Sequence, residues 1–386
     1  MLLLARKNLF SERTRLAISV GGVALAVFLI SLLLSLYRGW DEKVGGFVEN
    51  SPIDVWIGSQ GTQSFLTAAS ILPTEGDDGE GARDFLNDNP SVERWDYLIV
   101  RPLEGIKVKL PRDEDEPDAG TKMDLQLIGY NPLSGMGGPL KIVEGKATPG
   151  PGEVIVDEAL RDRYGVRVGD IVSAGGLDWT VVGVSSGGDF VAVQTVFTTL
   201  DAAREALSMQ GLTTFYVIDM KPKADEVDFA SDLEILFPAI AALPKGEFAQ
   251  ATRDRILGEI LPILVAVLGL AFIVGLAIAG LTIYTATVEK SREYGILKAV
   301  GFKNRYLYRV VLEQSLVTGT LGFAIGAGLT LAISPFARDF VPQFVTFVKW
   351  QDILLVAGAT LVMSGIAAYI PVRRLASIDP VAVFKA

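Results

Sequence analysis

Residues 289–309 read EKSREYGILKAVGFKNRYLYR, a charged stretch that lies between two long apolar runs. The segment REYGILKAVGFK predicts one or two short helical turns that are broken at Gly301. Anchoring on the cytoplasmic side of a membrane would account for its Lys and Arg residues. It would not account for the apolar group among them, which contact with a groove of a partner protein explains better. That group is Ile296, Leu297, Ala299 and Val300.

The composition indicates a membrane protein with a large water-facing part. Half of the 386 residues are apolar, which is too high a share for an ordinary soluble protein of this length. The charge is unevenly distributed, because residues 38–255 hold 20 Lys and Arg against 37 Asp and Glu, whereas the rest of the chain is basic. An acidic block therefore lies between basic, apolar segments.

Several chemical functions are excluded by the residues that the sequence lacks. There is no Cys and no His, so disulfides, thiolate or imidazole metal sites and Ser-His-Asp or Cys-His nucleophiles are excluded. No G-x-x-x-x-G-K-[ST] motif occurs, so this chain does not hydrolyse ATP through a P-loop. We expect a non-catalytic protein without a cofactor or metal site of its own.

Four apolar segments are long enough to cross a hydrocarbon core of about 30 Å. The second is longer than one crossing requires, so its excess predicts a helical stalk toward the acidic block, or a strong tilt. The basic N-terminus, residues 1–15, fits either an amphipathic helix at the interface or a charged flank of the first span. The expected spans are 16–37, 256–288 (stalk and span), 310–334 and 353–372, with a short external loop at 335–352.

The distribution of basic residues predicts the orientation. The N-terminus, the 289–309 loop and the tail 373–386 together carry 13 Lys and Arg, whereas the loop 335–352 carries only two. Since short loops decide orientation and long domains cross largely regardless of charge, both termini and the 289–309 loop are expected in the cytoplasm. Residues 38–255 are then outside.

Residues 38–255 read as an α+β domain with two lobes. One strand-helix-strand unit is expected at 53–57, 82–87 and 95–100, and a second at 215–220, 225–237 and from Lys245 to Phe248. Between them, 152–185 predicts a mainly β lobe with a helix at 157–164 and a hairpin turn at Gly175-Gly176. The acidic tract 112–118 lacks the pattern of a calcium loop and is read as a solvated loop.

The expected spans contain small residues and two acidic residues whose roles the sequence leaves open. Small residues recur at four-residue spacing and allow close helix packing, within the chain as the simpler interpretation or with a second copy. Glu259 and Glu313 lie near span ends, which favours interface contacts over an ion pathway. The small residues are Ala271, Gly275, Ala279, Gly322 and Gly326.

Three stretches resemble the MacB/FtsX family of ABC transporter permeases. The stretch from Glu293 to Gly301 is similar to the family signature E-x-G-I-L-[KR]-A-[LV]-G. The tail PVRRLASIDPVAVFK resembles the ending [PA]-x-R-R-x-x-x-x-[DN]-P, at Pro371, Arg373, Arg374, Asp379 and Pro380. GEVIVDEALRDRYGVRVGD, with the later TVVGV, is similar to the extracytoplasmic core of the family.

The resemblance implies a type VII, mechanotransmission architecture: one span, a large external domain with porter-like and sabre-like lobes, and three further spans. It implies a permease in the plasma (inner) membrane of a bacterium, paired with a second copy or a homologue. A separate ABC ATPase dimer would bind the ATP and magnesium. The residues implied to couple to that ATPase are Glu293, Tyr294, Gly295, Ile296, Leu297, Lys298, Ala299, Val300 and Gly301. We expect a change of charge or bulk at Gly295 or Leu297 to uncouple ATPase activity from transport while leaving membrane insertion intact.

Two functions follow from the resemblance. The first is efflux or extraction of a lipid, peptide or drug, with a periplasmic adaptor (membrane-fusion protein) or an extracytoplasmic cargo protein as a further partner and no nucleic acid. The second is FtsX-like regulation of a cell-wall hydrolase. The chain lacks the fused ATPase domain of MacB itself, and its length and acidic domain look nearer to DevC-like exporters. A domain of about 218 residues between 38 and 255 suits the first function better.

Overall fold

The protein divides into two units, which are described separately. The computed structural model describes residues 13–66, 70–108, 121–174, 177–188, 190, 193–340 and 345–376. By internal contacts, the helical unit comprises residues up to Gly39 together with those from Ile260 onward, and the α/β unit comprises Trp40–Glu259. The N-terminal residues 1–12, the acidic tract 112–118, the Gly175-Gly176 turn, Asp379 and Pro380 lie outside the described residues.

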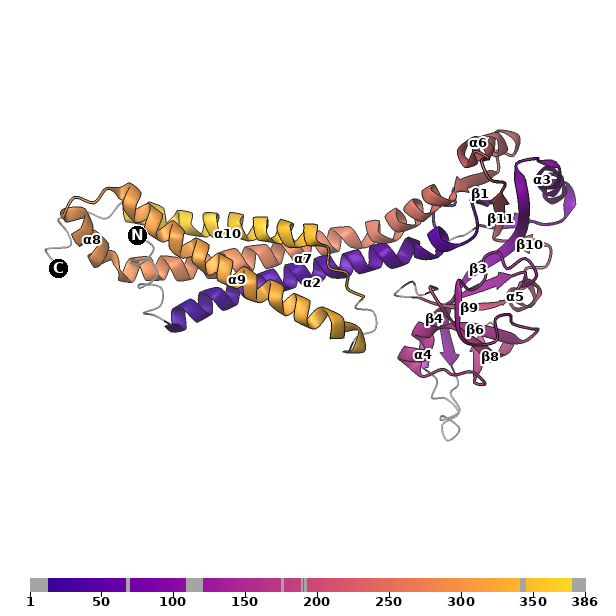
Figure 1. Ribbon diagram of the computed structural model, residues 1–386, viewed down its shortest axis with the longest axis horizontal. Helices are drawn as coiled ribbons and strands as arrows, with labels where there is room; N and C mark the ends of the chain where they lie inside the picture. The colour runs from indigo at the N-terminus through magenta and orange to yellow at the C-terminus, as the bar shows by residue number, and fades with distance from the viewer. Residues whose placement is uncertain are drawn as a thin grey trace. The chain divides into compact units, whose positions relative to one another are not determined.

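Four long helices account for the four expected spans (Figure 1). Each is long and apolar enough to cross a membrane, because each contains an uninterrupted apolar window that a hydrocarbon core requires. A fifth, short helix, α8 (Ser291–Ala299), separates the second long helix from the third. The long helices are α2 (Arg13–Asn50), α7 (Lys245–Glu289), α9 (Asn304–Phe340) and α10 (Trp350–Ala376).

Two of these helices extend further than the sequence predicts. Residues 38–50, which we assigned to the water-facing domain, continue α2. The strand expected from Lys245 is wrong, because the strand ends at Pro244 and α7 begins at Lys245 with Glu247 in its first turn. Proline cannot donate to a sheet ladder and an acidic residue favours the first turn of a helix, so this boundary has a physical basis.

Glycines let the helices of the helical unit approach closely, which confirms packing within the chain. A Cβ atom on Gly326 of α9 would lie 2.5 Å from the Ala24 carbonyl oxygen of α2. A Cβ atom on Gly322 would lie 2.5 Å from the Val23 side chain, and one on Gly275 of α7 would lie 2.6 Å from the Ala26 Cβ. Small residues at these crossings allow the backbones to come together where lipid supplies no hydrophobic driving force.

An ion pair joins α2 to α10 at one end of the helical unit. Arg38 donates two hydrogen bonds to Asp352, Nε to Oδ2 and Nη2 to Oδ1, both at 3.1 Å. The Asp352 side chain is only 9% exposed. Near this pair, the Phe347 backbone N–H donates to the Ser35 carbonyl of α2 at 2.9 Å, which ties the segment before α10 to the same helix.

Replacing Arg38 by Met will leave the Asp352 carboxylate without its bidentate partner. We expect a loss of about 2 kcal/mol in the free energy of unfolding, because a buried charge without a partner costs more than a neutral pair. The double change Arg38→Met with Asp352→Leu should recover most of that loss. The measurement is thermal unfolding of the full chain in detergent, evaluated as a double-mutant cycle.

The ion pair between Arg94 and Asp219 provides the matched control. It has a shorter N–O distance, 2.7 Å, but its Arg side chain is 46% exposed. Solvent-exposed pairs contribute only about 0–1 kcal/mol, so Arg94→Met should change stability little. Equal losses in Arg38→Met and Arg94→Met would contradict the buried-pair argument.

The α/β unit contains one ten-stranded sheet. Its order is β12-β1-β11-β3-β4-β9-β6-β8-β5, with β7 paired to β8, and β2 pairs separately with β10. The long strand β3 joins two lobes, since its first part pairs with β11 and its second part with β4. The strands are β1 (Val55–Ser59), β2 (Leu72–Pro73), β3 (Val92–Val108), β4 (Thr121–Tyr130), β5 (Lys141–Gly145), β6 (Glu153–Asp157), β7 (Ile171–Ala174), β8 (Leu177–Ser186), β9 (Gln194–Thr199), β10 (Leu212–Thr213), β11 (Phe215–Met220) and β12 (Ile240–Pro244).

Among the described residues, four short helices complete this unit, and helix α4 shows how cap residues in the sequence determine where a helix begins and ends. Helix α4 (Glu158–Tyr164) begins where the Asp157 carboxylate accepts from the Ala159 N–H, and it ends at Gly165 with a φ of 73°. Such an N-cap and a left-handed C-cap are the expected chemistry at helix ends. The remaining helices are α3 (Gly76–Asp88), α5 (Leu200–Leu207) and α6 (Glu226–Leu236).

The sequence predicts the two halves of the first lobe but not how the second lobe joins them. The expected strands 53–57, 95–100 and 215–220 correspond to β1, β3 and β11, and helix 225–237 to α6. The second lobe is inserted in the chain between β3 and β11, as expected, and it continues the sheet of the first lobe through β3. Its parallel pairs, β4 with β9 and β6 with β8, join strands far apart in the sequence.

The ends of α2 and α7 that lie in the α/β unit are firmly packed against its sheet. Phe47 of α2 and Phe248 of α7 are both fully buried in one cluster with Trp56 and Phe215. Arg253 of α7 forms an ion pair with Glu49 at 2.7 Å and donates to the Asp41 carbonyl oxygen of α2 at 3.0 Å. The two helices are therefore joined to each other and to the sheet.

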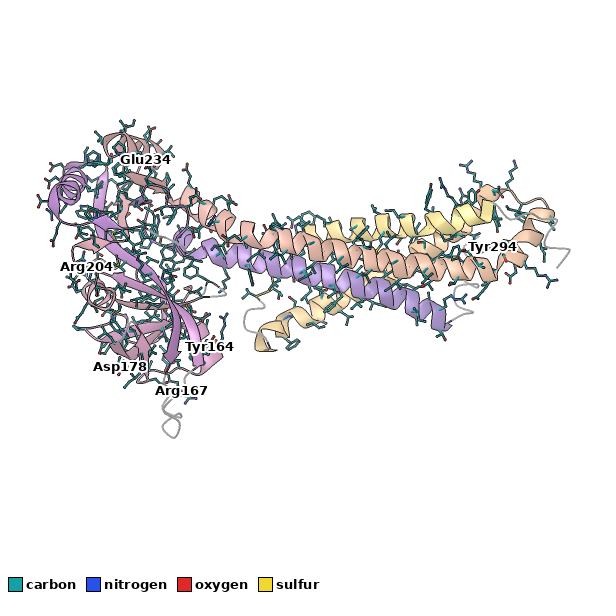
Figure 2. All side chains as sticks on the ribbon, turned by 180° about the vertical axis from the view of Figure 1, so that it is seen from behind. Tyr164, Arg167, Asp178, Arg204, Glu234 and Tyr294 are labelled. Carbon is teal, nitrogen blue, oxygen red and sulfur yellow. The ribbon has the colours of Figure 1, made fainter. Side chains whose placement is uncertain are left out.

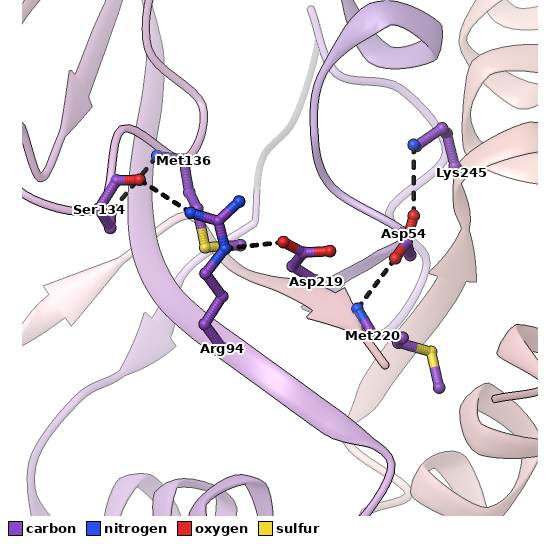
Figure 3. Close-up of polar contacts among 7 residues, drawn as sticks. All are labelled: Asp54, Arg94, Ser134, Met136, Asp219, Met220 and Lys245. Atoms are coloured by element: carbon purple, nitrogen blue, oxygen red, sulfur yellow. Dashed lines mark hydrogen bonds and ion pairs between the residues drawn. The ribbon is translucent and has the colours of Figure 1, made fainter. Parts of the chain in front are cut away.

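A second set of contacts holds the first residue of α7 to the sheet (Figure 3). The Asp54 carboxylate accepts from the Met220 backbone N–H at 2.9 Å and pairs with the Lys245 ammonium group at 3.3 Å. The Lys245 backbone N–H also donates to the Asp54 carbonyl oxygen at 2.7 Å. Because Asp54 precedes β1 and Met220 ends β11, displacement of these strands would act directly on the start of α7.

Candidate coupling site

Helix α8 lies at one end of the bundle, between the end of α7 and the start of α9 (Figure 1). It ends in a Schellman motif: the Gly301 N–H donates to the Lys298 carbonyl and the Phe302 N–H to the Leu297 carbonyl, each at 3.0 Å. Gly301 has a φ of 98°, in the left-handed region that glycine adopts without steric cost. The chain therefore turns sharply at Gly301, as the sequence predicts.

One face of α8 packs onto the helical unit. Tyr294 is 4% exposed and belongs to the same apolar cluster as Ile283, Leu307 and Val311 (Figure 2). Burial raises the pKa of the Tyr294 hydroxyl, the nearby Glu293 carboxylate adds to this, and a hydrogen bond with Gln314 opposes it. The neutral phenol thus anchors α8 to α7 and α9.

The opposite face of α8 is exposed, and much of it is apolar. Ile296 is 45% exposed, Val300 73% and Phe302, just after the helix, 42%. Glu293 and Ala299 are exposed on the same face, because residues three and four apart lie side by side on a helix. We call Ile296, Val300 and Phe302 the apolar surface of α8.

The structure separates the nine predicted coupling residues into three groups, of which five residues are exposed, two half-buried and two buried. Leu297 and Lys298 are half-buried, and Leu297 packs against the apolar cluster of the chain's own helices. Gly295 and Leu297 face inward, and the accessible apolar side chains are those of the apolar surface of α8. The expected uncoupling by changes at Gly295 or Leu297 stays a prediction. The exposed residues are Glu293, Ile296, Ala299, Val300 and Gly301, and the buried ones are Tyr294 and Gly295.

The sequence interpretation missed Phe302. A signal for it was present, because the residue after the left-handed glycine of a Schellman motif is frequently apolar.

In the C-terminal motif, Arg373 lies over the Tyr369 ring at 4.7 Å from its centroid, and Pro371 lies inside α10. The Arg374 side chain, Asp379 and Pro380 lie outside the described part.

The exposed face of α8 combines apolar and cationic side chains. Within the described ranges, no group of three or more acidic side chains is placed to hold a metal ion. The α8 surface instead presents apolar side chains beside the exposed cations Arg292, Lys303 and Arg305. An apolar centre with a charged rim is the usual composition of a protein-protein interface.

The fold is that of a membrane protein in which a short helix with an exposed apolar face separates the second long helix from the third. The FtsX-like permease C-terminal model matches residues 265–380, and the MacB-like periplasmic core domain model matches residues 16–236. The chain belongs to the MacB/FtsX family of ABC transporter permeases. It is a membrane-embedded permease with four span helices and a large extracytoplasmic α/β domain.

Relatives of the chain agree with this assignment. An uncharacterized ABC transporter permease of Mycobacterium tuberculosis is 25% identical over 395 residues, covering 100% of this chain and 99% of that protein. The macrolide export ATP-binding/permease protein MacB 2 of Aeromonas hydrophila is 29% identical over 96 residues, covering 25% of this chain and 15% of that protein. The periplasmic region of MacB from Actinobacillus actinomycetemcomitans aligns with a TM-score of 0.34 and 11% identity, over 54% of this chain and 96% of that one.

Proposed function

We propose that this permease couples a separate cytoplasmic ATPase dimer to a conformational change of its extracytoplasmic domain. The observation that carries the proposal is the apolar surface of α8, which remains accessible among the described residues, with Val300 73% exposed and the Phe302 ring lying 4.9 Å from the Tyr306 ring. An ABC permease requires an ATPase partner, and the ATP and magnesium would bind on that partner. The α8 surface, with its flanking cations, is the surface we assign to that contact.

The orientation follows from the basic residues. The segments at the α8 end of the spans and at both termini carry 13 Lys and Arg, and the opposite short loop carries two. By the positive-inside rule, α8 and both termini lie in the cytoplasm. This places the apolar surface of α8 where a cytoplasmic ATPase could reach it.

The route of mechanotransmission is the pair of helices α2 and α7. Each is continuous from the bundle into the α/β unit, without an intervening loop. Their ends in that unit are joined by the Arg253–Glu49 ion pair and the aromatic cluster around Trp56. A displacement of α7 at Glu289 would therefore act along one continuous helix, which contains Pro262, and through no intervening loop.

The cargo class that we propose is a lipid, peptide or drug that is exported or extracted, with the permease working as a dimer of two copies or of homologues. The chain has no catalytic constellation, so the work would be mechanical. The two-lobed sheet offers a large surface for an adaptor or cargo protein. FtsX-like control of a cell-wall hydrolase is the alternative outcome of the following test.

The test uses the full chain as bait. We expect the tagged permease, co-expressed with the ABC ATPase encoded beside it and extracted in mild detergent, to recover that ATPase and an adaptor or cargo protein. Recovery of a cell-wall hydrolase without an adaptor would favour the regulatory function instead. Failure to recover any ATP-binding protein would contradict the coupling role.

A further inference from the structure

An exposed apolar stripe runs along α6 of the α/β unit. Val227, Ser231 and Ile235 follow one another at four-residue spacing and therefore lie on one face of the helix. Val227 is 57% exposed, Ile235 73% and the adjacent Leu236 58%. Because these large aliphatic side chains are contiguous, they form the kind of apolar patch that marks a binding surface rather than isolated exposed residues.

The opposite face of α6 is fixed against the sheet and against α3. Phe229 and Leu233 are buried in the cluster that also contains residues of β1 and β11. The Phe85 ring of α3 lies 6.2 Å from the Phe229 ring and 5.9 Å from the Phe237 ring, between centroids. Helices α3 and α6 therefore lie side by side at one end of the α/β unit (Figure 1). We call the outward face of these two helices the α3–α6 surface.

The α3–α6 surface is strongly acidic. The two helices contain nine Asp and Glu and one basic residue, Arg83, which lies 3.9 Å from Glu80 of its own helix. Helices α4 and α5 of the second lobe are nearly balanced, with four acidic and three basic residues. Asp228 and Asp232 are exposed beside the apolar stripe, and among the described residues neither carboxylate forms an ion pair. Exposed carboxylates also follow at four-residue spacing on α3, at Glu80, Asp84 and Asp88.

The charge of this surface identifies the class of occupant. Residues 38–255 hold 37 Asp and Glu against 20 Lys and Arg, so the water-facing part of a second copy would be repelled. An anionic lipid surface would be repelled for the same reason. A helix with aliphatic residues on one side and Lys or Arg beside them matches both features, because a stripe at four-residue spacing is a ridge against which a second helix packs.

We propose that the α3–α6 surface binds a basic amphipathic helix of another extracytoplasmic protein. The aliphatic side chains of that helix cover Val227 and Ile235, and its cations pair with Asp228, Asp232 and the carboxylates of α3. The proposal deepens the proposed function, on which it rests for the role of that partner in transport. The contact itself requires no ATPase, and it is therefore measured in cells with and without the ATPase gene.

The test places the photo-crosslinking amino acid p-benzoylphenylalanine at position 227 of the full chain in its native membrane. We expect a light-dependent adduct with an extracytoplasmic protein. Mass spectrometry of the adduct should map it to a segment with aliphatic residues at three- and four-residue spacing and Lys or Arg beside them. The same amino acid at position 133, where Leu133 is 97% exposed in the same unit, should not give that adduct.

Three variants of the crosslinking chain test the chemistry of the contact. Asp232→Lys should lower the adduct yield about tenfold, because like charges repel across an interface. This change does not weaken α6, since a cation is favoured toward the C-terminal end of a helix. Ile235→Ser should lower the yield about fivefold, as the loss of a central apolar contact predicts. Glu205→Lys, the same charge reversal on an exposed residue in the last turn of α5, should leave the yield unchanged.

Several outcomes would overturn the proposal. They are the absence of an adduct, an adduct with lipid or with a second copy of this chain, and an adduct that maps to an acidic segment or to one without apolar spacing. Equal yields from Asp232→Lys and Glu205→Lys would do the same. Recovery of the ATPase without the adduct would contradict the α3–α6 contact alone, whereas the adduct without recovery of the ATPase would contradict only the coupling role.

Discussion

Val300→Asp will weaken the contact between the permease and its ATPase by about 2 kcal/mol or more, roughly 30-fold in Kd. Val300 is 73% exposed at the end of α8 and lies on one face with Ile296. A carboxylate there would be desolvated inside an otherwise apolar contact, which is costly without a partner cation. The readouts are co-purification of the ATPase and stimulation of ATP hydrolysis by permease in nanodiscs.

An aspartate introduced at an exposed position of the α/β unit provides the matched control for Val300→Asp. Leu133 is 97% exposed in the α/β unit, so Leu133→Asp adds an identical charge without burying it at the ATPase contact. This variant should retain full ATPase binding and stimulation. Val300→Asp with wild-type binding and stimulation would show that α8 docks through another face, and the docking assignment would have to be abandoned.

The inward residues of α8 should behave differently from Val300. Tyr294 is buried among helices of its own chain, so its loss would lower the stability of the bundle as well as coupling. Val300 contacts no such core, and Val300→Asp should leave the Tm unchanged. A reduction of Tm by Val300→Asp comparable to that caused by Tyr294→Ala would argue that the exposed face is structural.

The sequence predicts which segments cross the membrane because twenty or more apolar residues leave few alternatives. It does not separate the two faces of α8, since Ile296 and Leu297 are adjacent, equally apolar residues and only packing against Leu307 and Val311 decides which is inside. The end of α8 at Gly301 could be predicted, because a glycine after a helical segment indicates a left-handed turn directly.

Residues 38–50 show why the ends of α2 and α7 were not predicted. This segment contains Gly39, Gly45 and Gly46, which are unfavourable in an isolated helix and indicate a loop. In the structure, a Cβ atom on Gly45 would lie 2.5 Å from the guanidinium carbon of Arg253 in α7. The glycine thus makes room for a tertiary contact between helices more than two hundred residues apart, and such packing overrides local propensity.

The order of the strands in the sheet could not be predicted from the sequence for a related reason. The parallel pairing of β4 with β9 joins strands that are separated in the chain by β5, β6, α4, β7 and β8, and no periodicity in either strand specifies its neighbour. What the sequence does contain is the turn and cap chemistry, as at Asp157 and Gly165 around α4. Local structure was therefore predictable where a single residue type determines it, and long-range pairing was not.

Gly326→Ala will destabilise the full chain by about 1–3 kcal/mol, the usual cost of inserting a methyl group into a closely packed contact. The added Cβ would lie 2.5 Å from the Ala24 carbonyl oxygen and 2.8 Å from the Val27 Cβ, both on α2. Neither a backbone oxygen nor a Cβ can rotate away, so α2 and α9 must separate. The measurement is the Tm of the detergent-solubilised permease.

Gly328→Ala is a control on the same helix, for which we expect a change in stability of the opposite sign. No atom lies within 4 Å of a Cβ placed on Gly328, so alanine fits without displacement. Because alanine is favoured over glycine in a helix by about 1 kcal/mol, this variant should be neutral or slightly more stable than the wild type. If both variants lowered the Tm equally, glycine would be required for helix flexibility rather than for the approach of α2 to α9. Opposite signs would instead establish that Gly326 preserves the close approach of α9 to α2.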